Sequence, residues 1–199
     1  LGIGWNPRLN GNHAMLLEKH TAVRKGRIHD GKVMVMRSNL RWCSDGLEFT
    51  CWNGEAIRLA FIIDAFDREI IAWTAVANAG ISGSDVRDMM LEAVEKPFAA
   101  TRAPNPIEHL SDNGSAYTAR DTRLFAQALN LTPCFTPVAS PQSNGMSEAF
   151  VKTLKRDYIR ISALPDAETA LRLIDGWIED YNEIHPHSAL KMASPRQFI

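Results

Sequence analysis

The sequence predicts an α/β fold in which a mixed five-stranded sheet carries helices on its faces. Three extended, apolar segments follow one another in residues 41–76, and residues 84–135 then alternate between helical and extended patterns. The length of 199 residues, the 45% hydrophobic content and the 23% charged content are ordinary for one globular domain. Composition therefore excludes a disordered chain, a collagen-like repeat and a disulfide scaffold.

The first three strands are predicted to form an antiparallel meander. Residues 41–51 and 57–63 are extended and apolar, and Asn53-Gly54 between them is a strong hairpin signal. Residues 69–76 supply a third β-rich segment after a polar turn. We expect the next two strands to run parallel, because helices separate them along the chain.

Helical and extended patterns alternate in the second half of the chain. Apolar spacing predicts helices over 84–96, 118–129, 146–161 and 167–181, short strands over 107–110 and 131–135, and a loop over 136–145. Ser82 or Ser84 can cap the first of these helices, and Pro97 is expected to end it. Ser194-Pro195 resembles an N-cap followed by proline at the first helical position, so it predicts a short final turn.

Residues 1–40 are predicted to form a basic N-terminal arm or linker ahead of a core over residues 41–199. Residues 1–41 carry eight basic and two acidic side chains, net +6, which leaves net −7 for the remainder. This asymmetry favours a polyanionic partner for the arm, with Arg24, Lys25 and Arg27 as candidate phosphate contacts. The alternative is a solvated linker whose charges only aid solubility.

The compartment is predicted from cysteine usage and targeting signals. The three cysteines form no CxxC pair and are odd in number, so we expect reduced thiols and neither bridges nor a zinc site. We find no secretory signal and no apolar stretch long enough to span a bilayer. We therefore expect a cytoplasmic protein without membrane contact.

Three carboxylates occupy positions that a shared site requires. Asp45 lies within the first strand, where aspartate is uncommon; Asp112 ends the fourth strand; and Glu148 opens the helix after the loop. Like charges cannot share a dry pocket unaided, but a pair of divalent cations offsets the repulsion. Oxygen ligands suit Mg²⁺, with Mn²⁺ as a possible substitute, and two such ions support phosphodiester hydrolysis or transesterification.

Basic residues follow the third carboxylate on the same predicted helix. Lys152 and Lys155 lie four and seven residues after Glu148, on its helical face, and Arg156 extends the basic surface. This arrangement predicts phosphate contacts beside a metal site. The alternative is an intrahelical ion pair between Glu148 and Lys152, which would contribute only about 0.2–0.5 kcal/mol.

Other polar residues have simpler interpretations. Taken singly, Asp112 before Asn-Gly is a turn former, and Asp64 and Asp67 are expected to serve a turn. Asn113 is a candidate for contacting DNA or for positioning the neighbouring carboxylate. His109 is a weaker candidate for orienting a phosphate or a water molecule.

The combined motifs resemble a known family. The resemblance rests on Trp42-x-x-Asp45, Ser-Asp-Asn-Gly-Ser at 111–115, Ser-Pro-Gln-Ser-Asn-Gly-x-x-Glu at 140–148, and the closing segments at 181–190 and 194–198. These blocks are similar to the catalytic core of retroviral integrases, and the 35 residues between Asp112 and Glu148 match that superfamily's Asp-Asp-35-Glu spacing. Lys155 matches a basic position of insertion-sequence transposases. The sequence is most similar to OrfB-type transposases of the insertion-sequence-three family, over about residues 25–199.

The resemblance implies a ribonuclease-H-like fold and a DDE transposase. It implies that Asp45, Asp112 and Glu148 bind two divalent metal ions, and that the enzyme cleaves and joins DNA strands in transposition, integration and recombination. DNA, as transposon ends and target, is the expected partner, with a homo-oligomer assembled on it in the bacterial cytosol. A nuclease without strand transfer and a catalytically idle DNA-binding or assembly module remain alternatives.

Members of the family usually carry upstream helix-turn-helix segments, which this sequence lacks. Because it also begins at Leu1, we expect it to be the catalytic part of a longer transposase.

Overall fold

The computed structural model describes residues 35–135 and 145–199. The chain divides into two units, residues 1–34 and residues 35–199, and all described residues belong to the second unit. Arg24, Lys25 and Arg27, and most of the predicted loop before Glu148, lie outside the described residues.

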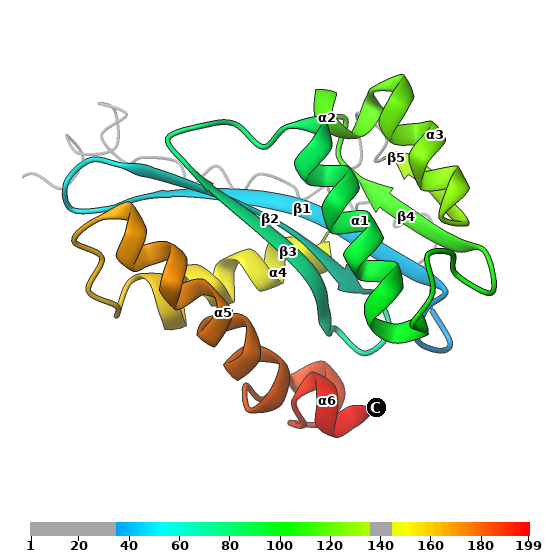
Figure 1. The fold of residues 1–199 in the computed structure, drawn as a ribbon. Helices are drawn as coiled ribbons and strands as arrows, with labels where there is room; N and C mark the ends of the chain where they lie inside the picture. The colour runs from blue at the N-terminus through cyan, green and yellow to red at the C-terminus, as the bar shows by residue number, and fades with distance from the viewer. Residues whose placement is uncertain (1–34, 136–144) are drawn as a thin grey trace, which may run out of the picture. The chain divides into compact units, whose positions relative to one another are not determined.

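Five strands form one mixed sheet in the order β3-β2-β1-β4-β5 (Figure 1). The strands are β1 (Arg41–Thr50), β2 (Ala56–Asp64), β3 (Ile70–Ala77), β4 (Ile107–Ser111) and β5 (Leu131–Phe135). β1, β2 and β3 pair antiparallel, whereas β4 pairs parallel with β1 and β5 pairs parallel with β4. The predicted mixed sheet and its meander are confirmed, including the Asn53-Gly54 turn, where Gly54 has φ +90°.

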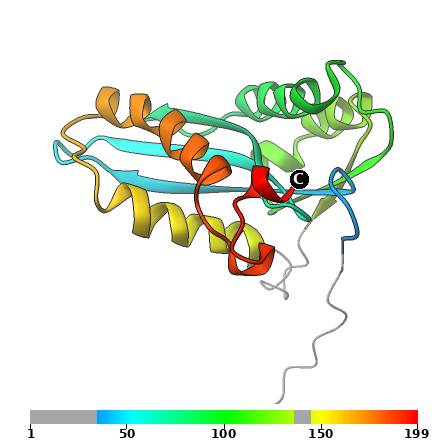
Figure 2. The same ribbon diagram turned by 90° about the horizontal axis from the view of Figure 1, so that it is seen from below.

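Helices cover both faces of this sheet (Figures 1 and 2). They are α1 (Gly83–Phe98), α2 (Ser115–Thr118), α3 (Arg120–Ala128), α4 (Gly145–Thr153), the π-helix η2 (Leu154–Ile159), α5 (Ala167–Glu183), the 3₁₀ turn η3 (Ser188–Leu190) and α6 (Pro195–Phe198). α1, α2 and α3 pack on one face around Trp42 and Ile62. α4, η2 and α5 pack on the other around Phe61 and Phe150, whose ring centroids are 4.5 Å apart.

The first helix extends past the residue predicted to end it. Pro97 lies inside the last turn of α1, and the helix ends at Phe98, with Ala99 as a C-cap in the left-handed conformation at φ 49°. Proline removes only its own N–H bond, while the Ala99 N–H still donates to the Glu95 carbonyl at 2.8 Å. At the other end, the predicted cap is confirmed, because Ser82 and Asp85 form a capping box.

The helix predicted over residues 118–129 is α3, and a separate short helix that was not predicted, α2, precedes it. Ala119 has ψ 139°, which separates α2 from α3. Tyr117 in α2 is buried and its hydroxyl lies 2.7 Å from Ser44 Oγ, so tertiary packing sets the direction of α2 independently of α3. Sequence periodicity does not report this break, since neither proline nor glycine marks it.

The helix predicted over residues 146–161 changes character at Leu154. Beyond it the helix is π-helical, and the Arg160 N–H donates to the Lys155 carbonyl, five residues earlier, at 3.2 Å. Phe150, Leu154 and Tyr158 are buried at intervals of four residues. That interval exceeds the 3.6-residue α-helical repeat, so a wider turn keeps these side chains on one face.

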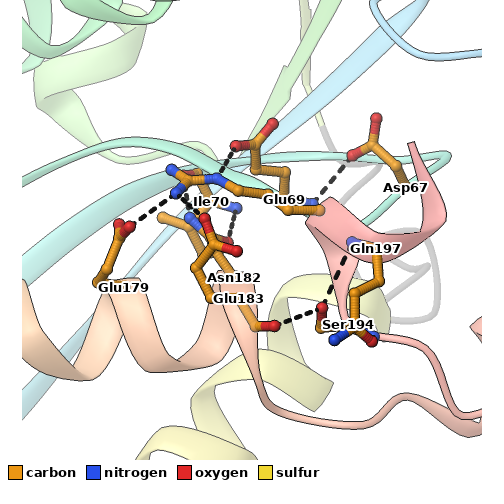
Figure 3. Close-up of polar contacts among 9 residues, drawn as sticks. Asp67, Glu69, Ile70, Glu179, Asn182, Glu183, Ser194 and Gln197 are labelled. Carbon is orange, nitrogen blue, oxygen red and sulfur yellow. Dashed lines mark hydrogen bonds and ion pairs between the residues drawn. The ribbon is translucent and has the colours of Figure 1, made fainter.

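α5 is tied to the edge strand β3 by one side chain (Figure 3). Asn182 is 1% exposed, and its amide accepts from the Ile70 N–H at 2.9 Å and donates to the Ile70 carbonyl at 3.0 Å. The side chain thus forms hydrogen bonds with two main-chain groups at the edge of the sheet. Without Asn182, these two groups would be buried and would have no partner.

A second link joins α6 to α5 and to the turn before β3 (Figure 3). The Arg196 guanidinium contacts Glu69 at 2.8 Å, Glu179 at 2.8 Å and Glu183 at 2.7 Å. Ser194 caps α6 and donates to the Glu183 carbonyl at 2.8 Å. The predicted N-cap at Ser194-Pro195 is confirmed.

Replacing Asn182 with Ala should destabilise the fold by about 2–4 kcal/mol, because two buried main-chain groups lose their partner. The free energy of unfolding from urea titration measures this effect. Asn105→Ala is the control, since Asn105 is exposed and the expected change there is within about 0.5 kcal/mol. Equal stability of the two variants would contradict the structural role of Asn182.

Candidate active site

The pleat of β1 sets the direction of Asp45. Successive side chains of a strand point to opposite faces. Cys43 and Leu47, two residues on either side of Asp45, lie in the core beneath α4 and α5. Asp45 therefore faces α4, whereas Ser44 and Trp42 face α1 and α2.

The same alternation places Asp112. β1 and β4 are parallel with Cys43 opposite Leu110, and Leu110 lies in the core beneath α4 and α5. Asp45 and Asp112 each come two residues after this pair, so both lie toward the same face of the sheet. The Gly114 N–H donates to Asp112 Oδ1 at 2.9 Å. A Cβ at Gly114 would lie 2.9 Å from that oxygen, so a larger residue there would displace the Asp112 carboxylate.

Glu148 reaches this region from the first turn of α4. The Phe150 ring in the same helix packs on the Phe61 ring, and Phe61 is the register partner of Asp45 on β2. Glu148 is exposed, as is Asp112, whereas Asp45 is partly buried. One aromatic contact thus places the start of α4 over the middle of β1.

The three carboxylates are electrostatic neighbours. Burial raises the pKa of Asp45, and the negative charges of Asp112 and Glu148 raise it further. The Gly46 N–H, which donates to Asp45 Oδ1 at 2.8 Å, opposes this rise. A carboxylate whose ionisation is resisted by two other carboxylates is suited to share a cation with them.

The donor chemistry of this group fits a hard divalent cation, because all of its ligands would be carboxylate oxygens. In residues 35–135 and 145–199, no group of three or more His, Cys, Asp and Glu side chains lies close enough to hold a metal ion. The role of Asp45, Asp112 and Glu148 as metal ligands therefore stays a prediction.

The basic residues after Glu148 differ in their ion pairs and in the type of helix that carries them. Lys152 Nζ lies 3.9 Å from Glu148 Oε2, so the alternative intrahelical contact is present, although the lysine side chain is 78% exposed. Arg156 is bound to Asp157 by two hydrogen bonds of 2.6 Å. Lys155 belongs to η2, so the seven-residue α-helical spacing from Glu148 does not hold there.

Three polar side chains lie on the reverse face of the two central strands. Ser44 and His109 are buried on β1 and β4, and Tyr117 of α2 lies against both, with its ring centroid 6.3 Å from that of His109. His109 is 2% exposed, and burial lowers its pKa to about 4. The ring lies away from solvent on the Trp42 side of the sheet, and the role of His109 in orienting a phosphate or a water molecule stays a prediction. The sequence did not predict the contact between Ser44 and Tyr117. The signal available in the sequence was a serine at a strand position that faces the core.

The second acidic pair serves a turn, as predicted. Asp64 accepts from the Asn39 and Phe66 N–H groups, each at 2.7 Å, and Asp67 accepts from the Glu69 N–H at 2.9 Å. Both line a pocket of about 400 Å³ that contains none of the three predicted ligands. Because their oxygens already accept main-chain hydrogen bonds, we assign this pocket no catalytic role.

Family comparisons identify the core. Residues 36–141 match the family described as Integrase core domain, and residues 129–195 match a second family of the same description. The chain belongs to the integrase core domain family. It is 96% identical over 189 residues to the insertion element IS136 uncharacterized protein of Agrobacterium tumefaciens (strain T37), covering 95% of this chain and 97% of that protein. It is also 49% identical over 193 residues to the transposase InsD for insertion element IS2D of Escherichia coli (strain K12), covering 96% of this chain but 64% of that protein.

Solved structures agree with this membership at the level of the fold. A chain of the simian T-cell lymphotropic virus intasome superimposes with a TM-score of 0.61 at 20% identity, covering 80% of this chain and 54% of that one. The catalytic domain of Mos1 mariner transposase superimposes with a TM-score of 0.58 at 14% identity, covering 71% and 70%. The integrase core thus has the ribonuclease-H-like sheet that the resemblance implied. Among its described residues, no helix has the length and hydropathy needed to cross a bilayer.

The Asp64 carboxyl should titrate far above an ordinary aspartate. Burial, joined by the charge of Asp67, raises its pKa from 3.8 to about 6. The folded state therefore holds this proton after the unfolded chain has released it, and stability from this group falls as pH rises through that interval. Carbon-13 NMR titration of the carboxyl measures the pKa. Asp67→Asn should lower it by removing a like charge, and a wild-type midpoint near 4 would contradict this assignment.

Proposed function

We propose that this integrase core is the catalytic domain of a DNA transposase that cleaves and joins strands by phosphoryl transfer. The observation that supports the proposal is electrostatic: the charges of Asp112, directly after β4, and of Glu148, in α4, both raise the pKa of Asp45 on β1. Membership of the integrase core domain family supports the same reaction class. We place this activity in the bacterial cytosol, where the DNA substrate lies.

We propose that the three carboxylates hold two divalent cations, Mg²⁺ or its substitute Mn²⁺. When bound, such ions supply Lewis-acid polarisation of the phosphoryl and attacking oxygens. Asp45 would provide a ligand from β1, Asp112 one from the turn directly after β4, and Glu148 one from the first turn of α4. With the carboxylates engaged as ligands, water would attack the phosphodiester in cleavage and a DNA 3′-hydroxyl would attack it in joining. A DNA 3′-oxygen would leave in each step, so no protein–DNA intermediate is needed.

Basic and amide side chains beside the carboxylates would hold the DNA backbone. We propose Lys152, Lys155, Arg156 and Asn113 for these contacts, since Lys152 and Asn113 flank Glu148 and Asp112 and are exposed. Arg156 would exchange its bonds to Asp157 for a phosphate. The arm residues Arg24, Lys25 and Arg27 remain proposed non-specific phosphate contacts.

The proposed partners are the transposon ends and a target duplex, with a homo-oligomer assembled on them. The intasome chain named above comes from an assembly, and another solved relative is a trimeric magnesium complex of the HTLV-2 integrase catalytic core. The chain spans 64% of the length of the InsD relative and 97% of the length of the IS136 relative.

A strand-transfer assay with pre-cleaved ends, a plasmid target and Mg²⁺ or Mn²⁺ tests this function. Joined product is the expected result. Hydrolysis without joining would instead identify a nuclease of the same fold. A folded protein that binds DNA and yields no product with either metal would identify a DNA-binding or assembly module.

Asp112→Asn should lower both cleavage and joining by about 10³-fold or more, because loss of one preorganised charge-stabilising group already costs about 10²–10³-fold. DNA binding should stay near the wild-type level, since the substitution changes no bulk. Asp121→Asn is the matched control, an exposed aspartate in the first turn of α3 that should keep full activity. Near wild-type rates for Asp112→Asn would remove Asp112 from the proposed ligands.

Lys155→Ala should weaken DNA binding and reduce the slope of log affinity against log salt by about one, the share of one phosphate contact. Metal affinity should not change. Lys96→Ala is the control, because Lys96 lies at the end of α1 and pairs with Glu92 at 2.7 Å. An unchanged salt slope in Lys155→Ala would show that this lysine does not contact the DNA backbone.

A further inference from the structure

Asp45 lies on β1 and Asp112 lies in the turn directly after β4, and the sheet alone does not hold this turn against β1. β4 ends at Ser111, so Asp112 lies beyond the last paired residue. Asp45, by contrast, lies in the middle of β1 and is paired in register with Phe61 of β2. The relative position of the two carboxylates therefore depends on what restrains the chain directly after β4.

α2 restrains that segment through a buried hydrogen bond. Tyr117 lies five residues after Asp112, and its hydroxyl oxygen is 2.7 Å from Ser44 Oγ. Ser44 is fully buried and Tyr117 is 9% exposed, so water does not substitute for either partner. Ser44 immediately precedes Asp45, and the bond thus joins the two ligand-bearing segments from the reverse face of the sheet.

The direction of this bond follows from counting protons. Ser44 Oγ also lies 2.9 Å from the Phe61 carbonyl oxygen, which can only accept. The single serine proton goes to that carbonyl, and the Tyr117 hydroxyl donates to Ser44 Oγ. Burial raises the pKa of Tyr117 to about 12, and the charges of Asp112 and Asp45 contribute, so the phenol stays protonated.

A short series of hydrogen bonds connects Tyr117 to the Asp112 carboxylate. The Tyr117 N–H donates to the Gly114 carbonyl at 3.0 Å, and the Gly114 N–H donates to Asp112 Oδ1 at 2.9 Å. A shift of Tyr117 would therefore move Gly114 and reorient the carboxylate. Because only a few residues separate Asp112 from Tyr117, the backbone between them has little freedom to absorb such a shift.

We propose that Tyr117 and Ser44 are positioning residues, whose hydrogen bond holds the Asp112 turn against β1 so that Asp45 and Asp112 can share a divalent cation. This inference rests on the proposed function and deepens it. Neither side chain touches the cation or the DNA, because both lie on the face of the sheet opposite the carboxylates. Their effect is on the geometry of the ligand pair before the cation binds.

The test compares full-chain variants that each remove one buried hydroxyl. Tyr117→Phe and Ser44→Ala break the bond from its two sides, and the double variant removes both groups. Tyr158→Phe is the matched control, because the Tyr158 hydroxyl donates to Asp180 Oδ2 at 2.7 Å between η2 and α5. Mn²⁺ affinity without DNA is measured by calorimetric titration, Tm by thermal unfolding, and strand-transfer kcat and KM against Mn²⁺ concentration.

Tyr117→Phe and Ser44→Ala should each weaken Mn²⁺ affinity about tenfold, the lower range for losing an outer-shell partner of a metal ligand. The Mn²⁺ concentration for half-maximal strand transfer should rise by the same factor, while KM for DNA stays unchanged. The double variant should lose little more than either single variant, since all three lack the same bond. Tyr158→Phe should lower Tm and keep wild-type Mn²⁺ affinity.

Wild-type Mn²⁺ affinity in Tyr117→Phe and Ser44→Ala would overturn the inference, and so would an equal loss of affinity in Tyr158→Phe. If Tyr117→Phe does not fold, the Mn²⁺ titration of Ser44→Ala alone tests the inference. A wild-type protein that binds no Mn²⁺ and joins no DNA would overturn the proposed function and this inference together. An active wild type with unaffected variants would overturn the inference alone.

Discussion

The alternation of side chains along β1 is the constraint on which the rest of the site depends. At Ser44 and Asp45 two neighbouring residues point to opposite faces, one into a buried polar contact with Tyr117 and the other toward α4. Because β4 pairs in parallel beside β1, Asp112 falls on the Asp45 face as well. A shift of one residue in this pairing would exchange the two faces and bury a carboxylate beneath α2.

The second constraint is the repulsion among carboxylates that this arrangement creates. Asp45 is the most buried of the three predicted ligands, and its raised pKa reflects burial first and the charges of Asp112 and Glu148 second. The fold therefore holds these groups together against an electrostatic cost. Stability must come from elsewhere, and the two apolar cores on either side of the sheet supply it.

The C-terminal segment contributes to that stability without taking part in the site. Asn182 satisfies the main chain of the edge strand at Ile70, and Arg196 joins three glutamates from α5 and the turn before β3. These contacts hold α5 against the sheet, and α5 in turn packs on Phe150 of α4 through Tyr181, with ring centroids 4.7 Å apart. The position of Glu148 thus depends on packing that begins at the far end of the chain.

The sequence by itself determined the element types, the mixed sheet and the three carboxylates, because hydrophobic period, turn residues and motif spacing are local signals. It did not determine the break at Ala119 or the π-helical turn after Thr153, which follow from how Tyr117 and Tyr158 are buried. It also missed Ser44 and Tyr117, which are 73 residues apart and meet only when α2 packs on β1. Tertiary structure decided these features, because a hydrogen bond between distant residues leaves no periodic trace in either segment.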